Sequence, residues 1–417
     1  MQTTGIASDQ LVNGLQLSLV IVGVAITIPA FLVGGEVVAG LGLKRAAIAV
    51  TLGSAAVAVI AALTMSLAAK LRRSTYEIIR GPFGTQGCRL VTLVMATSLL
   101  GWFGVTAQLF GQALAGAIEQ VANVSAPRWA MTLVGSGLMV TTTLFGFRAI
   151  ERLSRFVVPL LLVLLVVAVW LSVGQLSPEA LTANGTGSIT SLGTGVSVVI
   201  GAYMVAVTIA PDLARFVKTR GQATAAAFAG YGLGYGGVLM LAGIPGLLPI
   251  EGGYVERLVF LGLGIPALAL VVFATWTTNC SNLYSASLAF DTLIPGKRYR
   301  LVTVLAGAAG TLAGLAGLAD NLVPYLVLLS IAVPPISGIY LSHYLLLRLT
   351  EGDEKKGFAG EVPALLAWGV ATGVAWLASN GYLTLTGVGS LDSFLVAGAS
   401  YTLLRRTWPG QHPRARL

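Results

Sequence analysis

The feature that most constrains this chain is a series of long apolar runs along almost its whole length. Runs of about 20 apolar residues can cross the hydrocarbon core of a bilayer as helices. Charged residues make up only 10% of the chain, whereas soluble domains carry roughly 25%. The sequence therefore predicts an all-α integral membrane protein with twelve spans, near residues 15–40, 46–69, 90–119, 129–147, 155–174, 188–214, 222–247, 257–289, 300–317, 322–346, 362–378 and 384–403.

The basic residues favour one orientation of these spans. If the N-terminus is cytoplasmic, 21 of the 25 Lys and Arg residues fall on the inner side, as the positive-inside rule requires. We therefore expect a multi-pass protein of a prokaryotic plasma membrane with both termini in the cytoplasm. The net charge of +9 then reflects topology and not nucleic-acid binding. Residues 1–13 contain no Lys or Arg, so we expect the first span to be retained and not removed as a signal peptide.

Two spans carry helix-breaking residues at corresponding places. The first span contains Pro29 and the Gly34–Gly35 pair, and the sixth contains Gly201 and Pro211. Gly and Pro often serve only packing or kinking in membrane helices. A matched pair of broken helices in two five-span halves nevertheless favours a transporter of inverted repeats with a midplane site. We expect a single domain over 1–417, with a first repeat near 15–174, a second near 188–346 and two extra helices near 362–403.

The eighth span contains a dense cluster of hydroxyl and amide side chains. In "ATWTTNCSNLYSAS", three- and four-residue spacings place most of these groups on one helical face, namely Thr277, Thr278, Ser281, Asn282 and Ser285. Hard cations are bound by oxygen atoms, and adjacent hydroxyls with carbonyls freed at a helix break supply them. Such side chains also bond to their own helix. The density of the cluster favours an ion or substrate site.

The third span reads "LLGWFGVTAQLFGQAL" from Leu99. Trp102 lies more than ten residues inside the span, too deep for the interfacial aromatic belt. Its indole is suited to stack on a flat ring while Thr106, on the same face, reads the ring edge. Tyr203, just after the break that we expect at Gly201, offers a second ring. Gln108 and Gln112 fit either a functional role or hydrogen bonds between helices.

Other classes of protein fit the sequence less well. Cys88 and Cys280 are the only cysteines, which leaves no disulfide framework or Cys-rich metal site. The glycines of "GYGLGYGG" lie inside a span and follow no strand, so they do not form a dinucleotide fold. No carboxylate cluster or nucleophile motif indicates an enzyme. A channel would need a continuous polar pore, and the pair of broken helices argues against it.

Five motifs together carry a resemblance that extends from the second span to the tenth. They are "STYEIIRGPFGTQG", "GWFGVTAQLFGQA", "APDLARF", "WTTNCSNLYSASLAF" and "VPPISGIYLSHY". With them the chain resembles the nucleobase:cation symporter-1 family, in its bacterial cytosine-permease-like branch. The resemblance implies a LeuT-type fold of twelve helices, with two five-helix inverted repeats and broken first and sixth helices. It also implies a secondary active symporter that imports a nucleobase or related heteroaromatic ring by alternating access, coupled to sodium or protons. The expected partners are this small molecule and the lipid bilayer, with no nucleic acid and no protein partner.

The resemblance also implies roles for individual residues. Trp102 matches the stacking Trp, Tyr203 its partner ring, and Asn279 the polar residue nearest the substrate. The implied substrate-binding residues are Trp102, Thr106, Gly201, Ala202, Tyr203 and Asn279. The implied sodium ligands are the carbonyls of Gly23, Ile26 and Ala274 and the hydroxyls of Thr277 and Thr278.

The chain departs from the family pattern at positions that read the substrate edge. Leu99 stands where a Gln is expected, and Ala202 and Val205 stand where Ser is expected. His343 replaces an Asp. We therefore expect weak cytosine binding, and a hydroxymethylpyrimidine or hydantoin-type substrate stays open. Sodium is the expected coupling ion because its proposed ligands are neutral, with proton coupling as the alternative. An amino-acid carrier of the same fold is the other alternative; it would hold a carboxylate at the free N–H groups of the broken first helix.

Overall fold

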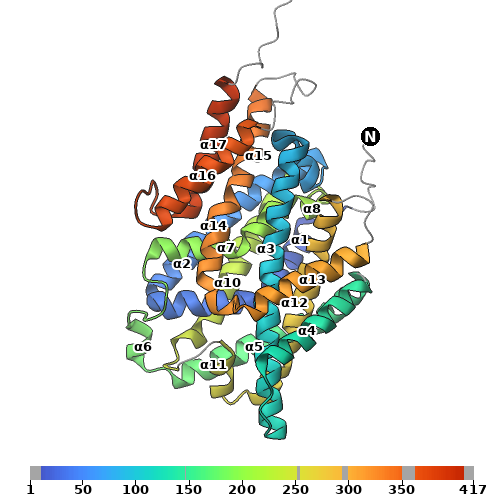
Figure 1. Ribbon diagram of the computed structural model, residues 1–417. Coiled ribbons are helices and arrows are strands. Elements are labelled where there is room, and N and C mark those ends of the chain that lie inside the picture. The colour runs from blue at the N-terminus through green and yellow to red at the C-terminus, as the bar shows by residue number, and fades with distance from the viewer. Residues whose placement is uncertain (1–10, 146, 251–253, 294–298, 350–361, 408–417) are drawn as a thin grey trace, which may run out of the picture.

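The computed structural model describes residues 11–145, 147–250, 254–293, 299–349 and 362–407. Within these ranges the secondary structure is helical, apart from connecting segments and one isolated parallel bridge between Val12 and Val217. The helices pack into one bundle in which the long α3 runs through the middle and α16 and α17 lie side by side at one edge (Figure 1).

Helices occupy all twelve positions that the apolar runs predict. Those of the first half are α1 (Gly14–Ala25), α2 (Ile28–Leu71), α3 (Thr75–Ala122), α4 (Arg128–Leu144), α5 (Phe147–Gln175) and the short α6 (Pro178–Thr182). The second half contains α7 (Leu192–Ile209), α8 (Pro211–Ala214), α9 (Arg220–Ala227), a π-helical segment (Phe228–Tyr235), α10 (Gly236–Gly243) and a 3₁₀ turn (Ile244–Leu247). It continues with α11 (Tyr254–Phe260), α12 (Gly264–Leu293), α13 (Tyr299–Leu315), a 3₁₀ turn (Ala319–Asn321), α14 (Leu322–Ala332) and α15 (Pro334–Leu349). The last two helices are α16 (Val362–Ser379) and α17 (Gly389–Thr407).

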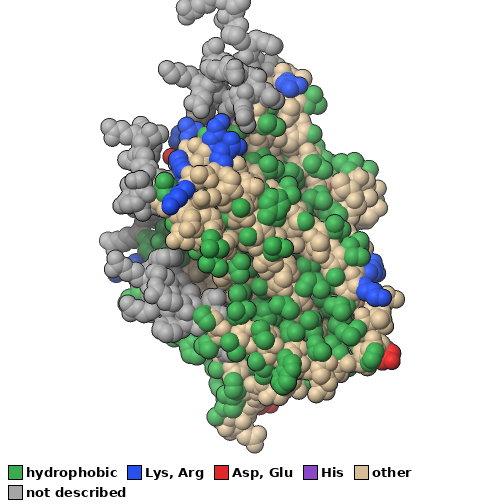
Figure 2. All heavy atoms as spheres, turned by 180° about the vertical axis from the view of Figure 1, so that it is seen from behind, with side chains coloured by type: hydrophobic (Ala, Val, Ile, Leu, Met, Phe, Trp, Pro, Cys, Tyr) green, Lys and Arg blue, Asp and Glu red, His purple; other side chains and the backbone are tan. Residues whose placement is uncertain are grey.

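The surface fits a bilayer. Seven helical segments of the described chain are long and apolar enough to cross a membrane, and three shorter apolar helices accompany them. Large side chains such as Trp170, Leu233 and Leu312 are exposed. Figure 2 shows hydrophobic side chains spread over one face, with most of the visible Lys and Arg at its upper end. The two ends of the chain, residues 1–10 and 408–417, lie outside the described residues, and with them the predicted orientation of the termini.

Two glycines bend helices that would otherwise be straight. Gly42 (φ 72°, ψ 162°) bends α2 between the part that belongs to the first predicted span and the part that belongs to the second. Gly84 (φ 62°, ψ −159°) separates the first turns of α3 from its predicted membrane span. Both have a positive φ, which L-residues with a Cβ rarely adopt. The kink at Gly42 therefore separates the two predicted spans that α2 covers without a loop.

The sixth span is interrupted at a different place from the one expected. Helix α7 runs through Gly201 without a break, and the interruption falls at Ala210, before Pro211. The prediction of a break at Gly201 is therefore wrong. A Cβ on Gly201 would come within 2.3 Å of the Leu326 carbonyl oxygen, so this glycine serves close packing of α7 on α14.

The loop between α2 and α3 is tied to the end of the sixth span. The Arg72 guanidinium donates to the carbonyls of Arg215 at 2.5 Å and Val217 at 2.6 Å. Asp212 Oδ1 accepts from the Thr75 backbone N–H at 2.8 Å. The two repeats are therefore joined at this end of the bundle by hydrogen bonds.

Candidate substrate and ion site

The first span is broken between α1 and α2. Ile26 (φ −82°, ψ 80°) and Thr27 (φ −141°, ψ 155°) leave the helical conformation. Pro29 follows in the first turn of α2, where its missing N–H costs nothing because first-turn amides have no intrahelical acceptor. The break frees backbone carbonyls at the end of α1 and amides at the start of α2.

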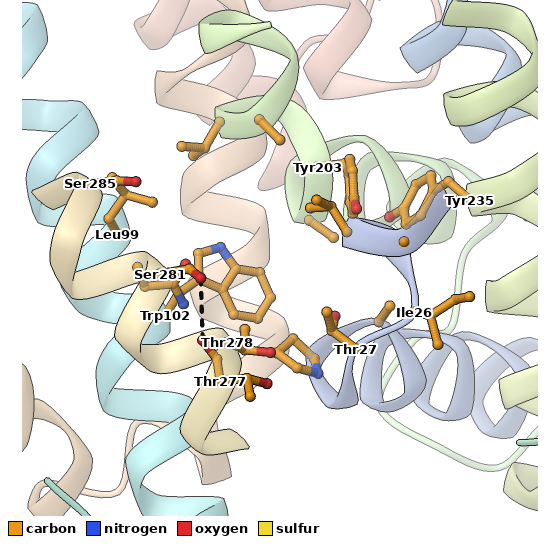
Figure 3. A pocket seen from close by; sticks show the side chains of 18 of the residues that line it. Ile26, Thr27, Leu99, Trp102, Tyr203, Tyr235, Thr277, Thr278, Ser281 and Ser285 are labelled. Atoms are coloured by element: carbon orange, nitrogen blue, oxygen red, sulfur yellow. Dashed lines mark hydrogen bonds between the residues drawn. The ribbon is translucent and has the colours of Figure 1, made fainter. Parts of the chain in front are cut away.

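A cavity of about 390 Å³ lies at this break. Its walls come from α1, α2, α3, α5, α7, α12 and the π-helical segment, and most of the lining side chains are apolar. Polar groups are confined to a few positions, chiefly on α12. Figure 3 shows Trp102 on one side of the cavity and Tyr203 with Tyr235 on the other, with Thr277 and Thr278 facing the break at Ile26 and Thr27. Apolar walls with a few placed polar groups are typical of small-molecule sites.

Four of the five residues predicted to hold sodium line this cavity. Gly23 and Ile26 reach it from the first span, and Thr277 and Thr278 reach it from α12. Ala274 lies behind the wall, and its carbonyl oxygen accepts a hydrogen bond from Thr277 Oγ1 at 2.9 Å. The arrangement brings neutral oxygen donors from the two repeats to one place.

Of the residues predicted to bind substrate, Trp102, Ala202 and Tyr203 line the cavity. Trp102 is 7% exposed, and its ring meets the edge of Tyr325 at a centroid distance of 5.6 Å. Tyr325 Oη donates to the Ser98 carbonyl at 2.5 Å. The indole is thus held from behind by one tyrosine while the other side faces the cavity.

The other three predicted substrate residues, Thr106, Gly201 and Asn279, do not line the cavity. Thr106 and Asn279 are fully buried, and the Thr106 hydroxyl bonds to Asn279 Oδ1. Asn279 Nδ2 donates to the Phe103 carbonyl at 2.9 Å. These bonds tie α3 to α12 behind Trp102. Gly201 packs against α14, as described above.

Several residues of the wall were missed by sequence reasoning, and Thr27 and Tyr235 are two of them that carry a polar group. Thr27 lies at the break, and Pro29, two residues later, is the signal that marks the place. Tyr235 lies within the motif "GYGLGYGG", whose glycines suggested only a dinucleotide site, and that site was excluded. A π-helical segment over Phe228–Tyr235 sets the direction of its side chain. Such segments are frequent at functional sites, but no residue pattern announced this one.

The glutamines of the third span lie toward a second, smaller cavity of about 200 Å³. Gln108 Nε2 donates to Asp320 Oδ2 at 2.8 Å, and its Oε1 accepts from the Ala319 N–H at 2.8 Å. Gln108 therefore joins α3 to the 3₁₀ turn at Ala319–Asn321 by hydrogen bonds. Gln112 lines the second cavity together with Glu36.

His343, the replacement for an expected Asp, lies apart from both cavities. It is 2% exposed, and its Nδ1 lies 2.6 Å from Tyr401 Oη and 2.6 Å from an Arg405 nitrogen. The histidine thus connects α15 to α17 and does not contact the predicted ion or substrate residues.

Comparisons with known proteins agree with this geometry. A family described as permeases for cytosine/purines, uracil, thiamine and allantoin matches residues 12–359. The cytosine permease of Escherichia coli (strain K12) is 27% identical over 393 residues, which cover 94% of this chain and 90% of that protein. The hydantoin permease of Microbacterium maritypicum is 21% identical over 365 residues, covering 82% and 74%. The inward-facing conformation of Mhp1 matches with a TM-score of 0.83 at 18% identity, covering 100% and 96%.

The structural match shows the fold, and the family match extends over most of the chain. The family match covers residues 12–359, and the structural match covers 100% of the chain. The chain has the LeuT fold and belongs to the nucleobase:cation symporter-1 family, the permeases for cytosine/purines, uracil, thiamine and allantoin, and it is an integral membrane transporter and not an enzyme.

Proposed function

We propose that the chain is a secondary active symporter that imports a nucleobase or related heteroaromatic ring together with sodium by alternating access. The observation that carries this proposal is the cavity itself. It brings Trp102, a stacking surface, within the same space as the broken first span and the Thr277–Thr278 pair. A ring and a cation bound there would both touch α12 and the first span, so each would influence the binding of the other.

The walls favour a ring with few hydrogen bonds along its edge. Leu99, Ala202 and Val205 line the cavity and offer no polar side-chain group. A polar ring edge left unpaired in such a site costs roughly 1–3 kcal/mol for each lost hydrogen bond. The chain is similar to both a cytosine permease and a hydantoin permease. We expect a hydantoin-type or hydroxymethylpyrimidine-type ring to bind more tightly than cytosine.

Sodium fits the donor set. Hydroxyls of Thr277 and Thr278 and carbonyls of Gly23, Ile26 and Ala274 are neutral hard oxygen ligands, which suit a hard cation. Among the described residues that line the cavity there is no Asp, Glu or His, so no titrating side chain stands beside the ion. Proton coupling would have to act through a group elsewhere, such as Glu36.

The same proposal includes the placement of the chain. It is one transmembrane domain of two inverted repeats and two extra helices, in a bacterial cytoplasmic membrane, with both termini in the cytoplasm. The unequal distribution of Lys and Arg supports this orientation.

The test uses purified full-length protein and a thermal-shift panel. Cytosine, uracil, hydantoin, allantoin and hydroxymethylpyrimidine are each measured in sodium, potassium and choline chloride at two pH values, with leucine as the amino-acid arm. We expect a ring to stabilise the protein more in sodium than in the other salts at both pH values. Stabilisation by leucine alone would favour an amino-acid carrier. Dependence on pH and not on sodium would assign the driving ion to the proton.

A further inference from the structure

Tyr203 has a hydroxyl that the protein leaves without a partner. The residue is 9% exposed, and its Oη is buried with no hydrogen bond among the described residues. The neighbouring Tyr235 is different, because its Oη donates to the Val199 carbonyl at 2.9 Å. Buried polar groups in native proteins are almost always paired, and an exception calls for an explanation.

The ring of Tyr203 is already packed by other aromatics. The Tyr235 ring lies 4.2 Å away between centroids at an interplanar angle of 35°, and the Tyr231 ring lies 5.6 Å away at 71°. Trp102, in contrast, makes its aromatic contact through a single edge-on neighbour, Tyr325. Tyr203 is therefore less free than Trp102 to offer a ring face to a substrate. The part of Tyr203 that lacks a partner is its hydroxyl.

A second set of unpaired donors lies close by at the start of α2. The first intrahelical bond there is from the Phe31 N–H to the Thr27 carbonyl at 3.1 Å, so the amides of Ile28 and Ala30 precede the helical ladder. The Thr27 side chain does not cap them. The N-terminus of a long helix favours a negative or electron-rich atom. Figure 3 shows the hydroxyl end of Tyr203 directed toward the segment that joins α1 to α2.

We propose that the Tyr203 hydroxyl and the first-turn amides of α2 together bind a carbonyl oxygen on the edge of the substrate ring. The backbone amides can only donate, and the Tyr203 hydroxyl can donate as well, so one atom that satisfies all of them is an acceptor and not a ring N–H or an amino group. Tyr203 lines the cavity, which places its side chain beside a ring bound there. The inference rests on the proposed function, and it makes Tyr203 a residue that selects carbonyl-bearing rings, such as oxo-pyrimidines, oxo-purines and cyclic ureides.

The experiment compares rings that differ at one group. Hypoxanthine and adenine carry a carbonyl or an amino group at the same purine position, and cytosine differs from 4-aminopyrimidine by its ring carbonyl. Uracil and hydantoin extend the carbonyl set. Dissociation constants are measured in sodium for wild type, Tyr203→Phe and Tyr235→Phe. Tyr235→Phe is the matched variant, because it also removes a phenol oxygen from the wall but one that is already bonded within the protein.

We expect wild type to prefer the carbonyl member of a pair, and Tyr203→Phe to weaken binding of that member about tenfold, as loss of one hydrogen bond implies. The carbonyl-free member should be unaffected, and Tyr235→Phe should keep the preference. The ligand-free melting temperature of Tyr203→Phe should equal or exceed that of wild type, because the variant removes an unpaired polar group.

Three results would overturn the assignment. If Tyr203→Phe keeps the wild-type preference while Trp102→Ala loses ring binding, the edge reader is elsewhere and the proposed function stands. If wild type binds hydroxymethylpyrimidine or another carbonyl-free ring but no carbonyl-bearing one, the assignment fails and the proposed function stands. If wild type binds no ring at all, the assignment and the proposed function fail together.

Discussion

The Thr277 hydroxyl donates to the Ala274 carbonyl one turn earlier in α12, at 2.9 Å. The bond fixes the direction of a hydroxyl that lines the cavity and leaves lone pairs on both oxygens. Thr278, the next residue, also lines the cavity, across from the break at Ile26. Two adjacent threonines thus line the same cavity, and the direction of the Thr277 hydroxyl is fixed by its bond to Ala274.

Thr278→Ala should abolish most of the stimulation of substrate binding by sodium. The variant removes one oxygen from the proposed ion site without emptying the substrate pocket, so affinity without sodium should change little. Binding measured in sodium and in choline checks this. Thr275→Ala is the matched control, because the Thr275 hydroxyl is buried and bonds back to Val271 on α12. Full sodium dependence in Thr278→Ala would place the ion elsewhere.

Trp102→Ala should weaken substrate binding by about tenfold to a hundredfold, since stacking on an aromatic side chain contributes roughly 1–3 kcal/mol. Isothermal titration of the purified variant measures the change. Trp170→Ala, which removes an indole that is 74% exposed on α5, should leave affinity as it is. Equal affinity in wild type and Trp102→Ala would rule out a stacked substrate.

Leu99→Gln should raise the affinity for cytosine several-fold. Leu99 lines the cavity, and an amide there would supply a hydrogen bond to the base edge worth about 0.5–1.5 kcal/mol. Competition by cytosine against the best ring of the panel gives the measurement. A variant that folds, judged by its melting temperature, and still ignores cytosine would show that this position does not read the edge.

Asn279→Ala should destabilise the fold by roughly 1–3 kcal/mol, because it leaves the Thr106 hydroxyl and the Phe103 carbonyl with one partner fewer in the interior. Thermal unfolding in detergent measures it. Asn282→Ala is the comparison, since Asn282 lines the cavity and should cost less stability. A stable Asn279→Ala with lost ring affinity would instead give Asn279 a direct role in substrate binding.

Gly84→Ala should reduce stability by roughly 1–3 kcal/mol, because the combination of φ 62° and ψ −159° is accessible almost only to glycine. Gly137→Ala is the control: Gly137 is helical, and an added Cβ meets no atom within 4 Å. That substitution should be neutral or stabilising. Similar melting temperatures for both variants would show that α3 tolerates straightening.

The spans could be predicted because the lipid interior requires a crossing segment to satisfy its own backbone hydrogen bonds as a helix and to be mostly apolar. Long apolar runs meet both requirements. The break of the first span could be placed only approximately, since Pro29 marks it from two residues downstream. The sixth span misled because Gly201 supports close packing with α14 as readily as it would support a break. Glycine content alone does not distinguish the two.

The candidate site divides in the same way. Trp102, Thr277 and Thr278 follow from spacing within single helices, and all three line the cavity. Asn279 and Thr106 are polar residues of the same two helices, α12 and α3, yet their side chains bond to each other between these helices and do not line the cavity. Which face of a helix meets the cavity depends on how neighbouring helices are rotated. That information is tertiary and is absent from one helix read alone.

Helix α3 of the first repeat contacts the second repeat and also lines the cavity. The Thr75 N–H at the start of α3 donates to Asp212 of the second repeat. Trp102, further along α3, lines the cavity, and the kink at Gly84 lies between the two residues. A displacement of α8 relative to the span of α3 must therefore stretch that bond or turn the backbone at Gly84. The residue on which we propose that the substrate stacks is thus connected, through the kinked helix α3, to α8, so that a movement at this end of the bundle is transmitted to the wall of the cavity.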